Sequence, residues 1–100
     1  MPERAIAIRI RPRARQDLKA IWRYTRDRWG EPQADLYLSQ LDAGIRSLLQ
    51  FPNVGESCDH IRAGYRKLHV HRHLIFYRSG DVQIEVVRVL HQAMDVSRHL

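Results

Sequence analysis

Apolar and polar residues alternate over residues 5–11, where Ile6, Ile8 and Ile10 occupy every second position. Alternate side chains of a β-strand share one face, so this pattern predicts a strand with one buried face. Pro12 follows, and its fixed backbone angle suits the first turn of a helix. We therefore expect a short N-terminal strand that leads directly into a helix.

Two segments with helical spacing come next. From about Pro12 to Trp29, the apolar positions follow one helical stripe: Ala14, Leu18, Ile21, Trp22, Thr25 and Trp29. From about Pro32 to Gln50, a second stripe consists of Ala34, Tyr37, Leu38, Leu41, Ile45, Leu48 and Leu49. Gly30 favours the end of the first helix. A connection of about three residues predicts that the helices fold back on each other as a hairpin.

The rest of the chain is rich in strand-forming residues. We expect strands at Tyr65–Val70, His73–Arg78 and Val82–Leu90, with a loop at residues 56–63 and a polar tail that includes a short helical turn. The order β-α-α-β-β-β places the helices before the main run of strands, which is typical of the α+β class. A chain of 100 residues predicts one domain, residues 1–100, in which the helical hairpin packs on a small antiparallel sheet.

The last two strands are apolar on both faces, and two helices can cover only one of them. We therefore expect part of the second face to be an exposed apolar groove flanked by arginines, lined by Ile75, Tyr77, Val87 and Val89. The neighbouring positions would line it instead if the faces are reversed. An amphipathic helix or an added strand would be the natural occupant. The alternative is a strongly curled sheet that buries both faces itself.

The chain is basic, and its charge is unevenly distributed. It has 17 Lys and Arg against 11 Asp and Glu, for a net charge of +6, and only Arg46 of the basic residues lies within residues 32–60. This asymmetry favours an acidic partner, either nucleic acid or an acidic protein. A protein that is merely basic would have the same composition.

Composition also bears on location. The apolar runs are at most five residues long, whereas a membrane span needs about 18. The arginine-rich N-terminus is unlike a secretory signal, and Cys58, the one cysteine, cannot form an internal disulfide. We therefore expect a cytoplasmic protein in a reducing setting, with no membrane contact.

Two local clusters contain residue types that carry chemistry. His69, His71 and His73 would share one face of a continuous strand and could bind zinc, but the chain must turn near Val70–Arg72. Residues 57–60 hold nucleophile and base types side by side, whereas catalytic triads are assembled from distant segments. We therefore expect no metal site and no cofactor.

A third set spans the predicted sheet. Arg66, Arg78, Arg88 and His91 lie on successive strands that could bring them together. Arginines with a histidine could bind a phosphodiester and transfer a proton, as RNA cleavage requires. The alternative is a solvated basic rim, or ion pairs with Asp81, Glu85 and Asp95.

Short motifs follow one another in a definite order over residues 6–100. They are Asp17–Trp22 with Tyr24, Arg28–Gly30, Ala34 with Tyr37–Leu38, Ile61–Leu68, Arg72–Arg78, and Val86–His91 followed by Asp95. In this order and spacing the chain resembles the ParE toxins of the RelE/ParE superfamily, the toxin halves of bacterial toxin–antitoxin pairs. The resemblance implies the same fold, a helical hairpin against an antiparallel sheet.

The resemblance also implies partners. A ParD-type antitoxin would fold its C-terminal segment onto the toxin, in a heterodimer or heterotetramer, and ParE toxins typically poison DNA gyrase and block replication. The expected antitoxin contacts are Leu18, Trp22, Ile75, Tyr77, Val87 and Val89. The expected target contacts are Arg66, Arg72, Arg78, Arg88, His91, Asp95 and Arg98.

Two alternatives stay open. The RelE branch cleaves messenger RNA on the ribosome, which would use Arg66, Arg78, Arg88 and His91 as catalytic residues. A relative that only binds its antitoxin would be non-toxic. The chain also departs from the family pattern, with His71 where many members have glycine, and with residues 92–94 in place of more basic ones.

Overall fold

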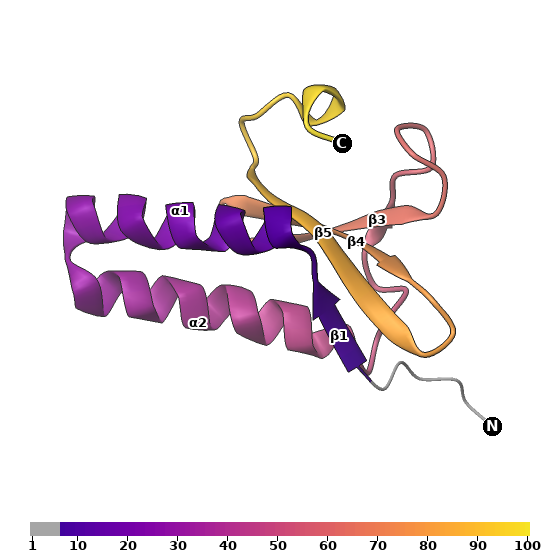
Figure 1. The fold of residues 1–100 in the computed structure, drawn as a ribbon, viewed down its shortest axis with the longest axis horizontal. Helices are drawn as coiled ribbons and strands as arrows, with labels where there is room; N and C mark the ends of the chain where they lie inside the picture. Colours follow the sequence, from indigo (N-terminus) through magenta and orange to yellow (C-terminus); the bar gives the residue numbers. More distant parts are fainter. Residues whose placement is uncertain (1–6) are drawn as a thin grey trace.

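The computed structural model describes residues 7–100 and contains two helices and five strands (Figure 1). In chain order these are β1 (Ala7–Ile10), α1 (Pro12–Trp29), α2 (Glu31–Ser47), β2 (Glu56–Ser57), β3 (Tyr65–Val70), β4 (His73–Ser79) and β5 (Gln83–His91). A short 3₁₀ turn, η1 (Val96–Arg98), follows β5. The α+β class is as predicted, and so is the element order apart from the additional strand β2. The predicted strand residue Ile6 lies outside the described residues.

The sheet has the strand order β1-β5-β4-β3-β2. The four strands from β2 to β5 pair antiparallel, as expected, whereas β1 pairs parallel with β5, so the sheet is mixed. Ile8 lies opposite Ile84, and Ile10 lies opposite Val86. The short strand β2, within the predicted loop, extends the other edge of the sheet by pairing with β3.

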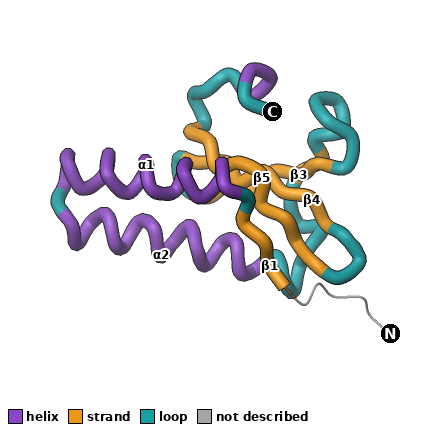
Figure 2. The backbone as a smooth tube through the Cα atoms, in the orientation of Figure 1, coloured by secondary structure: helices purple, strands orange, loops and turns teal. Residues whose placement is uncertain are grey.

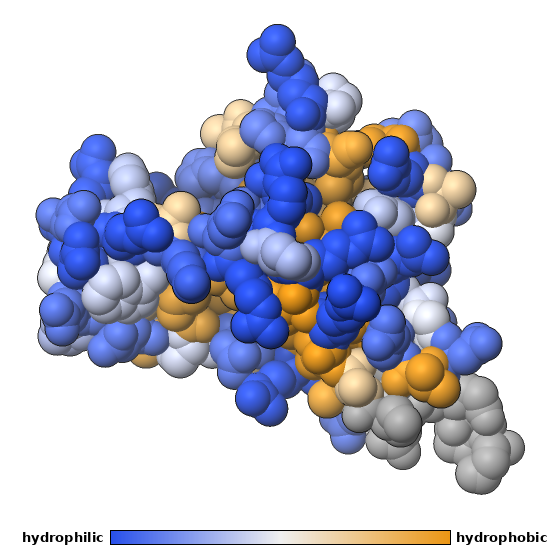
Figure 3. Space-filling view, viewed as in Figure 1, coloured by the Kyte–Doolittle hydropathy of each residue, from blue (hydrophilic) through white to orange (hydrophobic). Residues whose placement is uncertain are grey.

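The helices form the predicted hairpin, and Gly30 alone separates them. Its φ of 93° is a backbone conformation that glycine adopts at little cost. Figures 1 and 2 show the two helices side by side, projecting past one side of the sheet. Hydrophilic side chains cover much of α1 in Figure 3. Within residues 7–100, neither helix is long and apolar enough to cross a membrane.

The face of the sheet that packs on the helices carries most of the core. Ile75, Val86 and Val89 pack with Ala14 of α1 and Ile45 of α2, and Tyr77 and Ile84 pack with Leu48. We call this the helix-side face.

A β-bulge explains why β5 is apolar in both alternating sets. Phe76 pairs with Arg88 but the next residue, Tyr77, pairs with Val86, so Val87 is an extra residue in β5. A bulge shifts the alternation of side chains by one position. Val86 and Val89 therefore both contribute to the helix-side core although they are an odd number of residues apart.

The second face of the sheet, which we call the tail-side face, is buried rather than exposed. Leu74, Phe76, Val87 and Leu90 pack with Cys58 and Tyr65, and Val96 and Leu100 of the C-terminal tail pack against this cluster. The prediction of an exposed groove on the sheet is therefore wrong, whichever of the two alternating sets of residues is considered. The loop before β3 and the C-terminal tail are polar overall in sequence. Each nevertheless contributes a few apolar side chains, and these cover the face of the sheet that the helices leave free.

Candidate functional site: a groove along the helical hairpin

An open groove of about 610 Å³ lies between the helical hairpin and the adjoining ends of β4 and β5. We call it the hairpin groove. Its lining residues are Asp17, Ala20, Ile21, Tyr24, Thr25, Trp29, Gln33, Tyr37, Arg72, His73, Val89, Leu90, His91 and Met94. The groove exists because the hairpin extends beyond the sheet, so this stretch of the apolar helical stripe has no strand opposite it. Its wall is mainly apolar, with basic groups at the strand ends.

Large side chains at the rim of the groove are exposed. Tyr24 and Trp29 are 58% and 63% exposed, and Met94 is also exposed. The guanidinium carbon of Arg28 lies 5.0 Å from the ring centre of Tyr24 and 6.0 Å from that of Trp29. Tryptophan, tyrosine and arginine are the residues most enriched at the energetic centres of protein interfaces. This rim therefore has the composition of a surface that binds another protein.

A tyrosine and two histidines form the floor of the groove near the strand ends. The Tyr37 hydroxyl lies 2.7 Å from Nδ1 of His73 and accepts a hydrogen bond from the backbone N–H of Arg72 at 3.3 Å. His91 lies edge-on to His73, with ring centres 5.3 Å apart. Burial, with a smaller contribution from His91, lowers the pKa of His73 from 6.5 to about 4. His73 is therefore neutral at pH 7 and acts as a packing and hydrogen-bonding group.

The three histidines of the 69–73 run differ in their surroundings, although the rings of His71 and His73 both lie near the ring of Tyr37. His69 Nε2 lies 2.9 Å from the Gln92 side-chain oxygen, whereas His73 meets Tyr37. His71 lies in the turn between β3 and β4 with a φ of 53°, in the left-handed region. The prediction that the chain turns here and breaks the alternation is confirmed. Although histidine replaces the family's glycine, it adopts a backbone conformation that glycine favours.

The predicted nuclease set is not brought together. Arg66 lies opposite Tyr77, and His91 lies opposite His73, which puts them at different ends of the helix-side face. These positions are four residues apart on β4, a distance of about 13 Å along the strand. Arg78 lies opposite Tyr65, on the tail-side face. The strand register therefore separates Arg66 from His91 on one face and places Arg78 and Arg88 on the other.

Each of these arginines already has a structural partner. Arg66 donates to the carbonyl oxygen of Gly55 at 2.7 Å, and Arg78 lies 3.9 Å from Glu85. Arg88 is buried and donates to Asp17 through two nitrogens and to the carbonyl oxygen of His99. The Asp17 carboxylate also raises the pKa of Arg88. The alternative of ion pairs with the named acidic residues is confirmed for Arg78, which meets Glu85, whereas Arg88 pairs with Asp17, which was not among the predicted partners.

Some of the remaining predicted contact residues line the hairpin groove, and others lie elsewhere on the protein. Of the expected target contacts, Arg72 and His91 line the hairpin groove, Arg98 is exposed in η1, and Asp95 accepts a hydrogen bond from the Ser97 N–H at the start of η1. Of the expected antitoxin contacts, Val89 lines the groove.

The other expected antitoxin contacts lie elsewhere. Leu18 packs on the helix-side core, and the Trp22 indole N–H donates to Asp35 across the hairpin at 2.9 Å. Ile75 and Tyr77 are fully buried beneath the helices, and Val87 is buried beneath the tail. Ile75 and Tyr77 can therefore meet a partner only if part of the fold opens, whereas Val87 lines a small cavity on the tail-side face.

The sequence analysis missed most of the groove, above all Tyr24, Tyr37 as a hydrogen-bonding group, and Met94. Tyr24 lies off the apolar stripe of α1, among arginines, so the helical pattern assigns it to solvent. An exposed aromatic residue between arginines is itself a signal of an interaction surface, and it could have identified this rim.

The fold and the groove define a small basic α+β protein with an open, mainly apolar groove beside its helical hairpin. Residues 8–96 match the family described as the ParE toxin of the type II toxin–antitoxin system parDE, and the chain belongs to this family. Membership implies an antitoxin as a partner.

Known relatives agree with this assignment. The chain is 49% identical over 92 residues to toxin ParE1 of Mycobacterium tuberculosis, covering 91% of this chain and 94% of the relative. It is 42% identical over 92 residues to toxin ParE1 of Caulobacter vibrioides, covering 92% and 95%. Its fold is similar to a solved structure of the chromosomal ParDE system from P. aeruginosa, with a TM-score of 0.75 at 20% identity, covering 85% of this chain and 94% of that chain.

Proposed function

We propose that this toxin is neutralised by a ParD-type antitoxin, a segment of which occupies the hairpin groove. The observation that carries the proposal is the open apolar groove with its exposed rim of Tyr24, Trp29 and Met94. Arg28 and Arg72 lie at or beside the groove, so its occupant should be amphipathic and acidic. A helix presenting apolar residues on one face would fit this surface.

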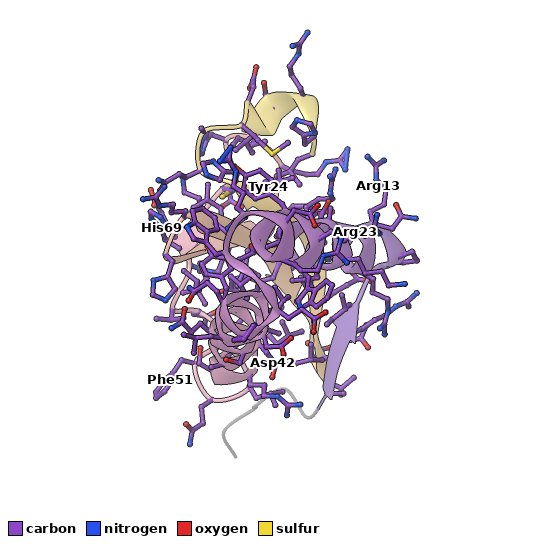
Figure 4. All side chains as sticks on the ribbon, turned by 90° about the vertical axis from the view of Figure 1, so that its left-hand side faces the viewer. Arg13, Arg23, Tyr24, Asp42, Phe51 and His69 are labelled. Carbon is purple, nitrogen blue, oxygen red and sulfur yellow. The ribbon has the colours of Figure 1, made fainter. Side chains whose placement is uncertain are left out.

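The groove can be tested by measuring the affinity of the toxin for its antitoxin. Trp29→Ala should weaken binding by tenfold or more, a loss of about 1.4 kcal/mol or greater, as for an aromatic residue at the centre of an interface. Phe51→Ala is the matched control, because Phe51 is 60% exposed and does not line the groove. Figure 4 labels Tyr24 in the upper middle of the view and Phe51 at the lower left. Equal affinities for the two variants would contradict the proposal.

The free toxin, in this proposal, inhibits DNA gyrase by binding and not by catalysis. The family assignment supports this activity, and the separation of Arg66, Arg78, Arg88 and His91 weighs against the alternative of RNA cleavage. Arg72, Asp95 and Arg98 are exposed, and we propose them as target contacts.

A supercoiling assay tests the target. Purified toxin should inhibit DNA supercoiling by gyrase, and a slight excess of antitoxin should restore it. No inhibition at a large excess of toxin would contradict the gyrase proposal, and cleavage of messages on translating ribosomes would support the nuclease alternative instead. The mass of the purified complex separates a heterodimer from a heterotetramer.

A further inference from the structure

A second, smaller cavity lies on the tail-side face, away from the hairpin groove. It has a volume of about 210 Å³ and is lined by Arg11, Arg13, Arg62, Tyr65, Val87, Arg88, His99 and Leu100. Three separate parts of the chain meet here: the residues around the start of α1, the loop before β3, and the C-terminal tail beside β5. We call it the arginine cavity, because four of its lining residues are arginines.

The acidic residues near this cavity offset only part of its charge. Arg88 is paired with Asp17, and Arg11 is paired with Glu85 at 3.0 Å. Glu85 is itself shared with Arg78. Among the residues that the structure describes, neither Arg13 nor Arg62 has an acidic partner. The first turn of α1, where Arg13 lies, also contains no acidic side chain.

The walls of the cavity are held in place. The guanidinium group of Arg62 stacks over the ring of Tyr65, with its central carbon 5.9 Å from the ring centre. The backbone of Arg62 donates to the Cys58 carbonyl at 2.9 Å and accepts from the Tyr65 N–H at 3.1 Å. Arg88 also lines the cavity, and it donates to the carbonyl oxygen of His99 and so ties the tail to β5. The arginines are therefore presented by ordered backbone, which lowers the entropic cost of binding a ligand.

We infer that the arginine cavity is a binding site for a phosphate group. Guanidinium groups reach the cavity from several directions, and a tetrahedral phosphate offers oxygens in several directions, whereas one planar carboxylate is satisfied by a single arginine. The uneven positive charge of the chain attracts such a ligand from solution. The phosphate can belong to the backbone of a nucleic acid or be free in solution. The site is independent of the hairpin groove and of the identity of the antitoxin and target.

Titration of the full-length protein with inorganic phosphate, followed by the NMR shifts of its backbone amides, tests the site. The amides of Arg13, Arg62 and His99 should shift together and reach saturation. The double variant Arg13→Gln/Arg62→Gln should bind roughly tenfold more weakly or worse, because it loses charge-assisted hydrogen bonds. Both side chains are exposed, so the variant should keep the unfolding midpoint of the unaltered protein.

The matched control is Arg23→Gln/Arg46→Gln, which removes the same charge at exposed positions outside the cavity. It should bind phosphate within twofold of the unaltered protein. Shifts spread evenly over all exposed arginines, or an equal loss of affinity in the control, would overturn the inference. If the first double variant unfolds, Arg62→Gln alone serves, since Arg62 lies in a surface loop.

A second titration distinguishes the source of the phosphate. A short DNA duplex that shifts the same amides, and whose affinity falls in Arg13→Gln/Arg62→Gln, identifies a nucleic-acid backbone as a ligand. If inorganic phosphate saturates these shifts and the duplex does not cause them, the ligand is a small phosphate-containing molecule. Failure of both ligands to shift these amides overturns the site.

Discussion

Asp17 on α1 and Arg88 on β5 form an ion pair with two parallel hydrogen bonds, at 2.8 and 3.0 Å. The Asp17 carboxylate also accepts the backbone N–H of Val89 at 2.9 Å, and Arg88 reaches the carbonyl oxygen of His99. One pair therefore fastens the first helix and the C-terminal tail to the same strand, just past the β-bulge. Its side chains are only 15% and 10% exposed.

Breaking this pair should destabilise the protein strongly. Arg88→Gln leaves the Asp17 carboxylate buried without its counter-charge, and we expect a loss of about 3 kcal/mol in the free energy of unfolding. Urea denaturation measures the loss. The exposed pair of Arg46 and Asp42 is the control, and Arg46→Gln should cost less than about 1 kcal/mol. Similar losses for the two variants would show that the Asp17–Arg88 pair has no special structural role.

The Tyr77 hydroxyl should also matter for stability. It donates to the carbonyl oxygen of Pro52 at 2.8 Å and accepts the N–H of Gly55 at 2.9 Å, so it ties the segment after α2 to the sheet. Tyr77→Phe leaves both backbone groups without this partner and should lower the free energy of unfolding by about 2 kcal/mol. Thermal and urea denaturation check this, with the exposed Tyr24→Phe as a control that should change little.

Tyr77 cannot serve as a probe of antitoxin binding by charge substitution. Its side chain is fully buried, so Tyr77→Asp should unfold the protein, since a buried unpaired carboxylate costs several kcal/mol. A folded Tyr77→Asp variant, with native circular dichroism and a cooperative transition, would contradict the burial of this residue.

Glycine at position 71 should make the protein more stable than histidine does. His71 has a φ of 53°, a conformation that costs a residue with a Cβ atom about 1 kcal/mol relative to glycine. We expect His71→Gly to raise the free energy of unfolding by up to that amount, reduced by the lost contact between the rings of His71 and Tyr37. His69→Gly is the control, because His69 lies in an extended strand, and that change should destabilise the protein. A loss of stability in both variants would contradict the prediction.

Stability should fall as the solution is acidified from pH 7 to pH 4. The pKa of His73 is about 4 in the folded protein and 6.5 in the unfolded chain, so within this range only the unfolded chain binds the proton. The stability associated with neutral His73 is fully present above pH 6.5 and is lost as the pH falls toward 4. Because the ring is only partly buried, we expect a loss of about 1–2 kcal/mol.

Urea denaturation at several pH values measures this dependence. His73→Gln should be less stable at pH 7 but should show a flatter dependence between pH 6.5 and 4. His60→Gln is the control, because His60 is exposed and should leave the dependence unchanged. The same slope in His73→Gln and in the unaltered protein would assign the pH dependence to other groups.

Local patterns in the sequence determined the helices and the longer strands of this fold. The helical stripe beginning at Pro12, the stop at Gly30 and the alternation around the 65–70 and 73–78 strands each depend on residues close together in the chain. The predicted turn at His71 depends on neighbours in the same way. Such features are predictable because backbone conformation and side-chain direction repeat with fixed periods.

Tertiary structure decided what covers the sheet and where the partner surface lies. The bulge at Val87 is set by pairing with β4, and the burial of Leu74 and Phe76 depends on Cys58, Val96 and Leu100, which are distant in sequence. The hairpin groove exists because the helices extend beyond the edge of the sheet. A one-dimensional pattern records whether a residue is apolar, but not which distant segment covers it. The sequence alone therefore determined the helices, the longer strands and the family resemblance, whereas tertiary packing added β2 as an edge strand and moved the expected groove from the sheet to the helices.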